Sequence, residues 1–414
     1  MYILQKIISW KTHLFLVTLF LTILGSHLFD DKIYLFVIAS IFLIDWKNIF
    51  SKESLLVAVF ILSIYIIWFS LDNNILFKID AAIKTISQLL LLFFAYLLGK
   101  SIRLDVKNSS HEVIRYSFYL LFSFFIAYSF MILYSYFTIK QDTPLTWQGL
   151  FVNFPNEYQR LHVNGGRLIS TIIAYYLTIS SLIFAYLVIF FDKLQAARVF
   201  SLVEFFLLIF ISIFSLYIAS LMGRRVTIVL FIAIFVTLLI IRLIFISAAK
   251  ERMVILLLLV VLTLLFYYLF GDILKEKFSY IYHRLTHQGL RAKRFTFWTP
   301  ALKIMLEHPF GGGHNFYVAP GMKLAHNTWI DIGKDFGIFP FLLFFAVSAL
   351  HLYYAIKIFF SSLIANFIKY QILIILCGLI TMLMIEPIFT SDKTLFAYIL
   401  FIFGFIAKVR QRVE

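Results

Sequence analysis

Apolar runs of about 20 residues recur along this chain, and they constrain its fold more than any other feature. A helix of about 20 residues is what the hydrocarbon core of a bilayer requires. The runs lie near residues 14–29, 33–46, 55–71, 82–99, 116–138, 168–191, 202–222, 226–247, 253–271, 337–361, 370–390 and 394–408. They predict an all-α, polytopic membrane protein of about twelve transmembrane helices, which forms a single integral-membrane domain over residues 1–414.

The composition excludes an ordinary soluble protein. Hydrophobic residues make up 62% of the chain and charged residues 14%, whereas a soluble domain is about half apolar and a quarter charged. The single cysteine, Cys377, excludes an intrachain disulfide and a cysteine-based metal site. The net charge of +15 favours anionic partners, either membrane lipids or a phosphorylated substrate, and we expect no nucleic acid among the partners.

Lysine and arginine in the short loops predict the orientation of the chain. They gather in the segments that face the cytoplasm if the amino terminus does, and they are few in the short outer turns. Both termini are therefore expected in the cytoplasm. The pair Arg224–Arg225 lies in an outer turn between two apolar runs and breaks this pattern, so its position needs another explanation.

Two outer segments are longer than a turn. Residues 139–166 carry the proline, glycine and asparagine of irregular backbone, and residues 272–336 are long enough to be functional. Within the second segment, residues 294–308 predict an amphipathic helix, in which Pro300 is tolerated only near the first turn. The residues expected on its shared apolar face are Phe297, Ala301, Ile304 and Met305. The glycines at 311–313 then end the helix, because glycine permits a positive φ and a close approach of backbones.

Arginines and histidines dominate the polar residues of the outer segments. They are Arg160, Arg167, Arg224, Arg225, Arg291, Lys293, Arg294, His314 and His326. Carboxylates are scarce there and no metal-binding motif is present, so we expect no catalytic metal. This set suits the transfer of a sugar from a lipid diphosphate to a hydroxyl. Arginine binds the oxygens of the leaving diphosphate, and histidine can act as the base that takes the proton of the hydroxyl.

Three motifs resemble those of the O-antigen ligase and polymerase superfamily. They are R-R-V-T-I-V-L from residue 224, R-F-T-F-W-x(2)-A-L-x(5)-H-P-F-G-G-G from residue 294, and H-N-T-W-I-D-I-G-x(3)-G from residue 326. The resemblance implies a C-type glycosyltransferase-like fold in the bacterial inner (cytoplasmic) membrane, with many transmembrane helices. It also implies that residues 272–336 are a large, partly helical periplasmic loop that carries the catalytic residues.

The reaction that this resemblance implies is the transfer of O-antigen glycan from undecaprenyl diphosphate to a hydroxyl of the lipid A–core oligosaccharide, without metal or cofactor. Arg225 matches the family's arginine at a helix start, Arg294 the arginine that opens the loop helix, and His326 the histidine of the H-N pair, expected to be the base. Asp331 stands where many members have glutamate. Further contacts to the substrates are expected from Arg224, Arg291, Arg160, Arg167, His314 and Asn327.

Other interpretations stay open at this point. A polymerase of the same superfamily would use a second lipid-linked repeat as the acceptor, and the sequence does not separate it from a ligase. A flippase or transporter would need polar residues near mid-membrane, whereas here they gather at one surface. The Arg224–Arg225 pair could also serve only to anchor two helices to lipid headgroups. Asp45, Glu204 and Glu386 lie within or at the ends of predicted spans, and we interpret them as scattered, unpaired carboxylates that make polar contacts between helices.

Overall fold

A computed structural model describes part of the chain in detail. The described residues are 41–71, 79–101, 161–163, 166–168, 235–236, 239–240, 242–243, 294–364, 366–391 and 393–411. The chain divides into two compact units, the first made of Met1–Thr138, His162–Leu168 and Lys293–Glu414, and the second of Ile139–Leu161 and Ile169–Ala292. The helices discussed below all belong to the first unit.

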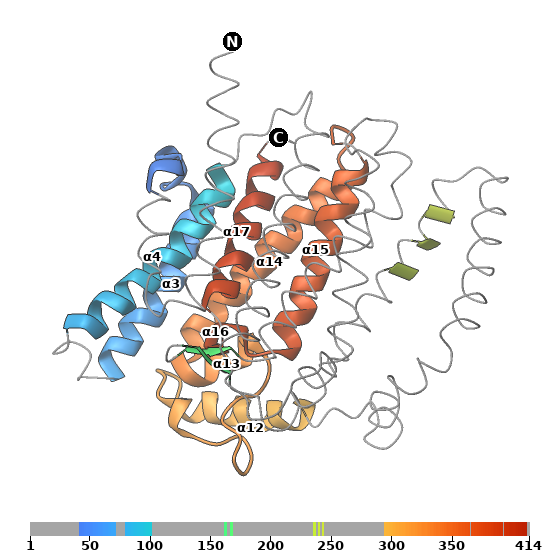
Figure 1. Ribbon diagram of the computed structural model, residues 1–414. Helices are drawn as coiled ribbons and strands as arrows, with labels where there is room; N and C mark the ends of the chain where they lie inside the picture. The colour runs from blue at the N-terminus through green and yellow to red at the C-terminus, as the bar shows by residue number, and fades with distance from the viewer. Residues whose placement is uncertain are drawn as a thin grey trace, which may run out of the picture. The chain divides into compact units, whose positions relative to one another are not determined.

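Helices make up nearly all of the regular structure in these residues (Figure 1). The α-helices are α3 (Lys52–Leu71), α4 (Ile79–Ser101), α12 (Arg294–Glu307), α13 (Thr328–Phe336), α14 (Ile338–Phe360), α15 (Asn366–Ile385), α16 (Ile388–Ser391) and α17 (Lys393–Arg410), and two 3-10 turns are η1 (Trp46–Asn48) and η3 (Gly313–Asn315). Two short strands, β1 (Leu161–Val163) and β2 (Gly166–Leu168), pair with each other. Apart from this pair and one isolated bridge, the predicted all-α class is confirmed for the described part of the chain.

Among the described residues, α3 and α14 are long and apolar enough to cross a membrane. They fall on the predicted runs 55–71 and 337–361, and helices α4 and α17 fall on the runs 82–99 and 394–408. The other runs lie wholly or mostly outside the described residues: 14–29, 33–46, 116–138, 168–191, 202–222, 226–247 and 253–271. A count of about twelve transmembrane helices in one domain over residues 1–414 therefore stays a prediction.

The predicted run 370–390 is not one continuous helix. Helix α15 ends at Ile385 and α16 begins at Ile388, with Glu386 and Pro387 between them. Proline has no N–H to donate, and its ring disfavours the helical backbone at the residue before it. The chain therefore turns at Glu386, which lies at the end of the bundle that carries α13, since α13 contacts both α15 and α16.

Helix α17 packs along α4 more extensively than any other pair among the described helices (Figure 1). Two glycines make this possible. A β-carbon on Gly99 would overlap the carbonyl oxygen of Phe401, and a β-carbon on Gly404 would overlap that of Tyr96. Small residues let helix backbones approach closely in a membrane, where apolar side chains gain little by exchanging lipid for protein. The reciprocal glycines therefore fix how closely α4 and α17 approach.

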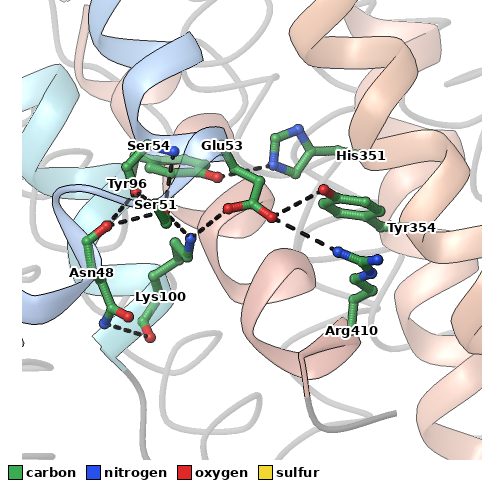
Figure 2. Close-up of polar contacts among 9 residues, drawn as sticks. All are labelled: Asn48, Ser51, Glu53, Ser54, Tyr96, Lys100, His351, Tyr354 and Arg410. Atoms are coloured by element: carbon green, nitrogen blue, oxygen red, sulfur yellow. Dashed lines mark hydrogen bonds and ion pairs between the residues drawn. The ribbon is translucent and has the colours of Figure 1, made fainter. Parts of the chain in front are cut away.

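A mostly buried carboxylate joins four helices near the amino-terminal end of α3 (Figure 2). Glu53 accepts hydrogen bonds from Nζ of Lys100 at 3.0 Å and from the hydroxyl of Tyr354 at 3.1 Å, and Nη1 of Arg410 lies 3.8 Å from it. The fully buried Lys100 also donates to Oγ of Ser51. The Glu53 cluster, defined as Glu53, Lys100, Tyr354 and Arg410, thus connects α3, α4, α14 and α17. Because a buried charge is costly when unpaired, the cluster fixes which turns of these helices face one another.

A second polar contact lies beside the Glu53 cluster (Figure 2). Nδ1 of His351 is 2.7 Å from the carbonyl oxygen of Val347, which can only accept, so Nδ1 carries the proton. Nε2 of His351 lies 3.3 Å from the Tyr96 hydroxyl, within hydrogen-bond distance. The imidazole also stacks on the ring of Phe403, with ring centroids 4.7 Å apart. This buried histidine belongs to the contact between α4, α14 and α17.

We expect the Lys100→Met substitution to lower the free energy of unfolding by about 3–5 kcal/mol, because it removes the closest cation from a mostly buried carboxylate. Adding Glu53→Gln should restore part of this loss, because the side chain at position 53 then carries no charge that needs the missing lysine. Thermal unfolding of the purified variants in detergent measures both effects. The control is Lys303→Met on α12, whose side chain is 77% exposed. Equal unfolding temperatures for the Lys100 and Lys303 variants would contradict the role of the cluster.

Candidate functional site

The predicted loop helix is present as α12, which begins at Arg294 and ends one residue before the predicted end at 308. In Figure 1 it lies across the end of the bundle, beneath α13. Its inner face contacts the segment that leads to His326, and the buried residues of this small core are Ala301, Ile304, Val318, Ala325 and Ile330, with Phe297, Trp298 and Met322 packed against them. Ala301, Ile304 and Met305 are buried as predicted. Pro300 lies inside the helix, beyond its first turn, where a proline was not expected to be tolerated.

The glycine segment joins α12 to the carboxyl-terminal end of α13. Gly311 and Gly312 have φ angles of 98° and 96°, which favour glycine. The N–H of Gly312 donates to the carbonyl of Asp335 at 3.0 Å, and Nζ of Lys334 donates to the carbonyl of Gly313 at 3.3 Å. A β-carbon on Gly313 would overlap the carbonyl of Lys334. The backbone of the segment that follows α12 is therefore hydrogen-bonded to α13. This agrees with the close approach of backbones that the glycines predict.

Helix α13 is anchored on the bundle by aromatic contacts at both of its ends. At its carboxyl-terminal end, the ring of Phe336 lies 6.0 Å from that of Trp68 on α3 and 5.7 Å from that of Phe389 on α16. Near its amino-terminal end, Nε1 of Trp329 donates to Oγ of Ser348 on α14 at 3.2 Å. Since α14 begins right after Gly337, α13 lies next to a helix that is long and apolar enough to cross a membrane.

The turn before α13 is held by two side chains of the helix itself. Asn327 is the N-cap, and its side chain accepts from the N–H of Ile330 at 3.1 Å. The carboxylate of Asp331 reaches back and accepts from the N–H groups of Ala325 at 2.7 Å and of Asn327 at 3.2 Å. These two bonds bracket His326, so Asp331 fixes the backbone on both sides of that residue.

His326 has a left-handed backbone, with a φ of 56°, and no other non-glycine residue in the described part of the chain has a positive φ. Such a conformation is strained for a residue with a β-carbon, and it persists only where the surroundings impose it. Here the bonds to Asp331 impose it. Backbone strain of this kind clusters at functional sites, which makes His326 a candidate functional residue.

The His326 side chain meets α12 on one side and the break between α15 and α16 on the other. Its ring centroid lies 6.4 Å from that of Phe297, and its Nδ1 lies 3.9 Å from Oε2 of Glu386. The His326 side chain is 23% exposed and that of Glu386 6% exposed. Glu386 is thus not the scattered, unpaired carboxylate that we predicted. It is a mostly buried group that faces the candidate base.

Thr328 connects the two sides of this site. Its hydroxyl donates to the carbonyl of Glu386 at 2.6 Å and accepts from the N–H of Ile388 at 3.0 Å. Both are backbone groups of the turn around Pro387, where the helix is interrupted. One buried threonine therefore joins the start of α13 to the turn that carries Glu386.

The structure places the other predicted site residues in three ways. Asn327 is the N-cap beside His326, and His314 is exposed in η3. Arg294 is the first residue of α12 and Arg167 lies in β2, and only their backbone positions are described. Arg225 and the predicted substrate-binding residues Arg224, Arg291 and Arg160 lie outside the described residues. The meeting of Arg225, Arg294 and His326 around one diphosphate therefore stays a prediction.

Sequence reasoning missed the contributions of Glu386 and Asp331. A carboxylate followed by proline within an apolar run, as at Glu386–Pro387, was the available signal, because it marks a helix break with an acidic group.

The described residues contain no group of three or more histidine, cysteine or acidic side chains that could hold a metal ion.

Burial raises the pKa of Asp331 from its ordinary value to about 6, against the opposing effect of the two backbone N–H bonds. An aspartate in the unfolded chain titrates near pH 4. Between about pH 4 and pH 6 the folded chain therefore binds more protons than the unfolded chain, and this group's contribution to stability falls as the pH rises through that window.

We therefore expect the stability advantage of the wild type over the Asp331→Asn variant to be about 1.3 kcal/mol greater at pH 5 than at pH 7. The comparison cancels the titration of all other groups. Thermal unfolding of both proteins at the two pH values is the measurement, with the exposed Glu307→Gln as the control. An advantage that does not change with pH would contradict the assigned burial of Asp331.

Comparison with known families supports the motif analysis. A family model described as O-antigen ligase matches residues 207–345, which are about a third of the chain. The matched segment contains Arg225, Arg294 and His326, and it ends within α14. No curated protein matches the chain. The family match confirms the resemblance predicted from the motifs, since residues 207–345 are similar to the O-antigen ligase family.

Proposed function

We propose that this chain is a glycosyltransferase that moves O-antigen glycan from undecaprenyl diphosphate to a hydroxyl of the lipid A–core oligosaccharide. The family match implies a glycosyltransferase-like enzyme of the O-antigen pathway with lipid-linked substrates. The observation that carries the reaction is the placement of His326. Asp331 fixes its strained turn, its side chain is partly exposed, and the helix that follows it leads directly into α14. A rigid, accessible histidine next to a membrane-spanning segment suits a base that meets its substrate at the membrane surface.

The reaction needs one proton acceptor and one stabiliser of negative charge. The oxygen of the acceptor hydroxyl attacks the anomeric carbon of the donor glycan, and its proton passes to His326. The bond between the anomeric carbon and the phosphate oxygen breaks, and its electron pair leaves with undecaprenyl diphosphate. Arg225 and Arg294 bind the oxygens of this leaving group, for which the planar guanidinium is suited. The start of α12 adds the partial positive charge of a helix amino terminus at Arg294.

The other predicted residues extend this site. Arg224, Arg291, Arg160, Arg167, His314 and Asn327 are proposed to contact the two lipid-linked substrates. The protein lies in the bacterial inner membrane with both termini in the cytoplasm, and residues 272–336 face the periplasm, where these substrates meet. No metal or cofactor takes part, because a diphosphate is already a stable leaving anion and arginine supplies the positive charge.

We expect His326→Ala to reduce glycan transfer by at least about 10²-fold, because the general base is lost. Arg225→Lys and Arg294→Lys should each cost on the order of 10²–10³ in rate, because an ammonium group does not reproduce the two-pronged contact of arginine with phosphate. The measurement is transfer by the purified protein in proteoliposomes that contain undecaprenyl-diphosphate-linked glycan and lipid A–core, with EDTA present throughout.

Two control variants test whether these losses are specific. His308→Ala removes a histidine whose ring stacks on Phe316, outside the turn that holds His326. Lys303→Ala removes an exposed cation of α12. Both should keep most of the activity. Full activity of a well-folded His326→Ala variant, or transfer that needs magnesium or manganese, would refute the proposed mechanism.

The acceptor distinguishes a ligase from a polymerase of the same superfamily, and deletion of the gene reveals it. Loss of the ligase should remove all long-chain lipopolysaccharide while lipid-linked polymer accumulates. Loss of a polymerase should instead leave lipopolysaccharide that carries a single repeat. Electrophoresis of lipopolysaccharide from the deletion strain is the measurement, and a single-repeat band would replace the ligase assignment with the polymerase.

A further inference from the structure

We propose that Glu386 is the positioning residue for His326, and that it holds the imidazole as the tautomer with the proton on Nδ1. The structural part of this proposal concerns two side chains of the protein alone. Its kinetic part rests on the proposed function, in which His326 is the base. The two parts can be tested separately.

The first line of evidence is the environment of Nδ1 of His326. This nitrogen is buried, and it has no hydrogen-bond partner within the described part of the chain. Oε2 of Glu386 lies 3.9 Å from it, about 1 Å beyond a hydrogen bond. Catalytic hydrogen bonds are often long in the absence of substrate and shorten when it binds. Since Nδ1 itself is buried, the 23% exposure of the side chain comes from its other atoms.

The second line of evidence is that the backbones of both residues are fixed. The N–H of Glu386 donates to the carbonyl of Met382 at 3.0 Å, and its own carbonyl accepts from the Thr328 hydroxyl at 2.6 Å. Across the site, Asp331 holds the backbone on both sides of His326. Only side-chain torsions therefore have to change for Nδ1 and Oε2 to come within hydrogen-bond distance.

The neighbouring carboxylate does not compete for this role. Both oxygens of Asp331 accept from backbone N–H groups, Oδ1 from Ala325 and Oδ2 from Asn327. Asp331 thus fixes the turn, whereas Glu386 faces the imidazole ring. Asp331 therefore positions the backbone of His326, and Glu386 positions its side chain.

The chemical consequence follows from the two nitrogens of neutral imidazole. One of them carries a proton and the other a lone pair. A carboxylate that accepts from Nδ1–H leaves the lone pair on Nε2, which then takes the proton of the attacking hydroxyl. The imidazolium that forms is opposed by the negative charge of Glu386, so the pair becomes neutral overall. Without the carboxylate, part of the histidine would have its proton on Nε2 and could not act as a base through that atom.

The structural part is tested by ¹⁵N NMR of histidine-labelled protein in lipid bilayers, with the His326 signals assigned by their loss in His326→Gln. The wild type should show Nδ1 protonated. Glu386→Leu should shift the population toward Nε2–H, whereas Glu386→Gln should keep Nδ1–H because its amide oxygen still accepts. Met384→Leu, an exposed position two residues earlier, is the matched control and should match the wild type. Identical tautomers in the wild type and in Glu386→Leu would overturn the proposal.

The kinetic part uses the same variants in the transfer assay. Glu386→Leu should lower kcat by on the order of 10²-fold with little change in the KM for the lipid-linked donor, because only the proton transfer is impaired. The kcat of Glu386→Gln should fall between those of the wild type and Glu386→Leu, because this variant keeps the tautomer but lacks the charge. Glutamine also has nearly the shape of glutamate, so this variant can be measured even if the leucine variant fails to fold.

The outcomes separate this proposal from the proposed function. If His326→Ala is inactive while Glu386→Leu and Glu386→Gln retain the kcat of the wild type, the role of Glu386 is refuted and that of His326 stands. If His326→Ala is fully active, the proposed function fails, and the NMR result alone then decides whether Glu386 orients the ring.

Discussion

The paired carboxylate of Glu53 sets the register of helices that otherwise have little to distinguish one turn from the next. The helices of this bundle are rich in phenylalanine, leucine and isoleucine on all sides. In a membrane such side chains are solvated equally well by lipid, so apolar packing alone selects a register weakly. Ion pairs and hydrogen bonds of Glu53 with Lys100, Tyr354 and Arg410 are made in one arrangement only (Figure 2). This interaction therefore determines where the opposite ends of the same helices lie.

The candidate site is built at those opposite ends. Helix α13 rests on α3 through Phe336 and Trp68, and it joins the α15–α16 turn through Thr328. The site thus depends on the positions of α3 and of the α15–α16 turn, which the bundle fixes. The bonds of Asp331 fix the turn that carries His326. A strained histidine backbone can persist there because the strain is small compared with the contacts that impose it.

The sequence predicted the local features well because they depend on local chemistry. The loop helix from Arg294 and the glycine break after it follow from apolar spacing and from the backbone freedom of glycine, and the structure confirms both. The approach of Glu386 to His326 joins residues that are far apart in the chain, and no spacing rule contains it. Pro387 is visible in the sequence, but the apolar run 370–390 was predicted as one helix across it. The positions of the arginines around the donor depend on how distant segments meet, which periodicity does not report.

The reciprocal contact of Gly99 with Phe401 and of Gly404 with Tyr96 has a consequence for the order in which the protein is assembled. During synthesis, α4 is made long before α17 exists, so its Gly99 face lacks this partner until then. Glu53 and Lys100 can pair early, whereas Arg410 joins them only with α17. The turn that carries Glu386 also emerges late. The protein therefore acquires its bundle register and the turn that carries Glu386 only after helices α15 to α17 have been made.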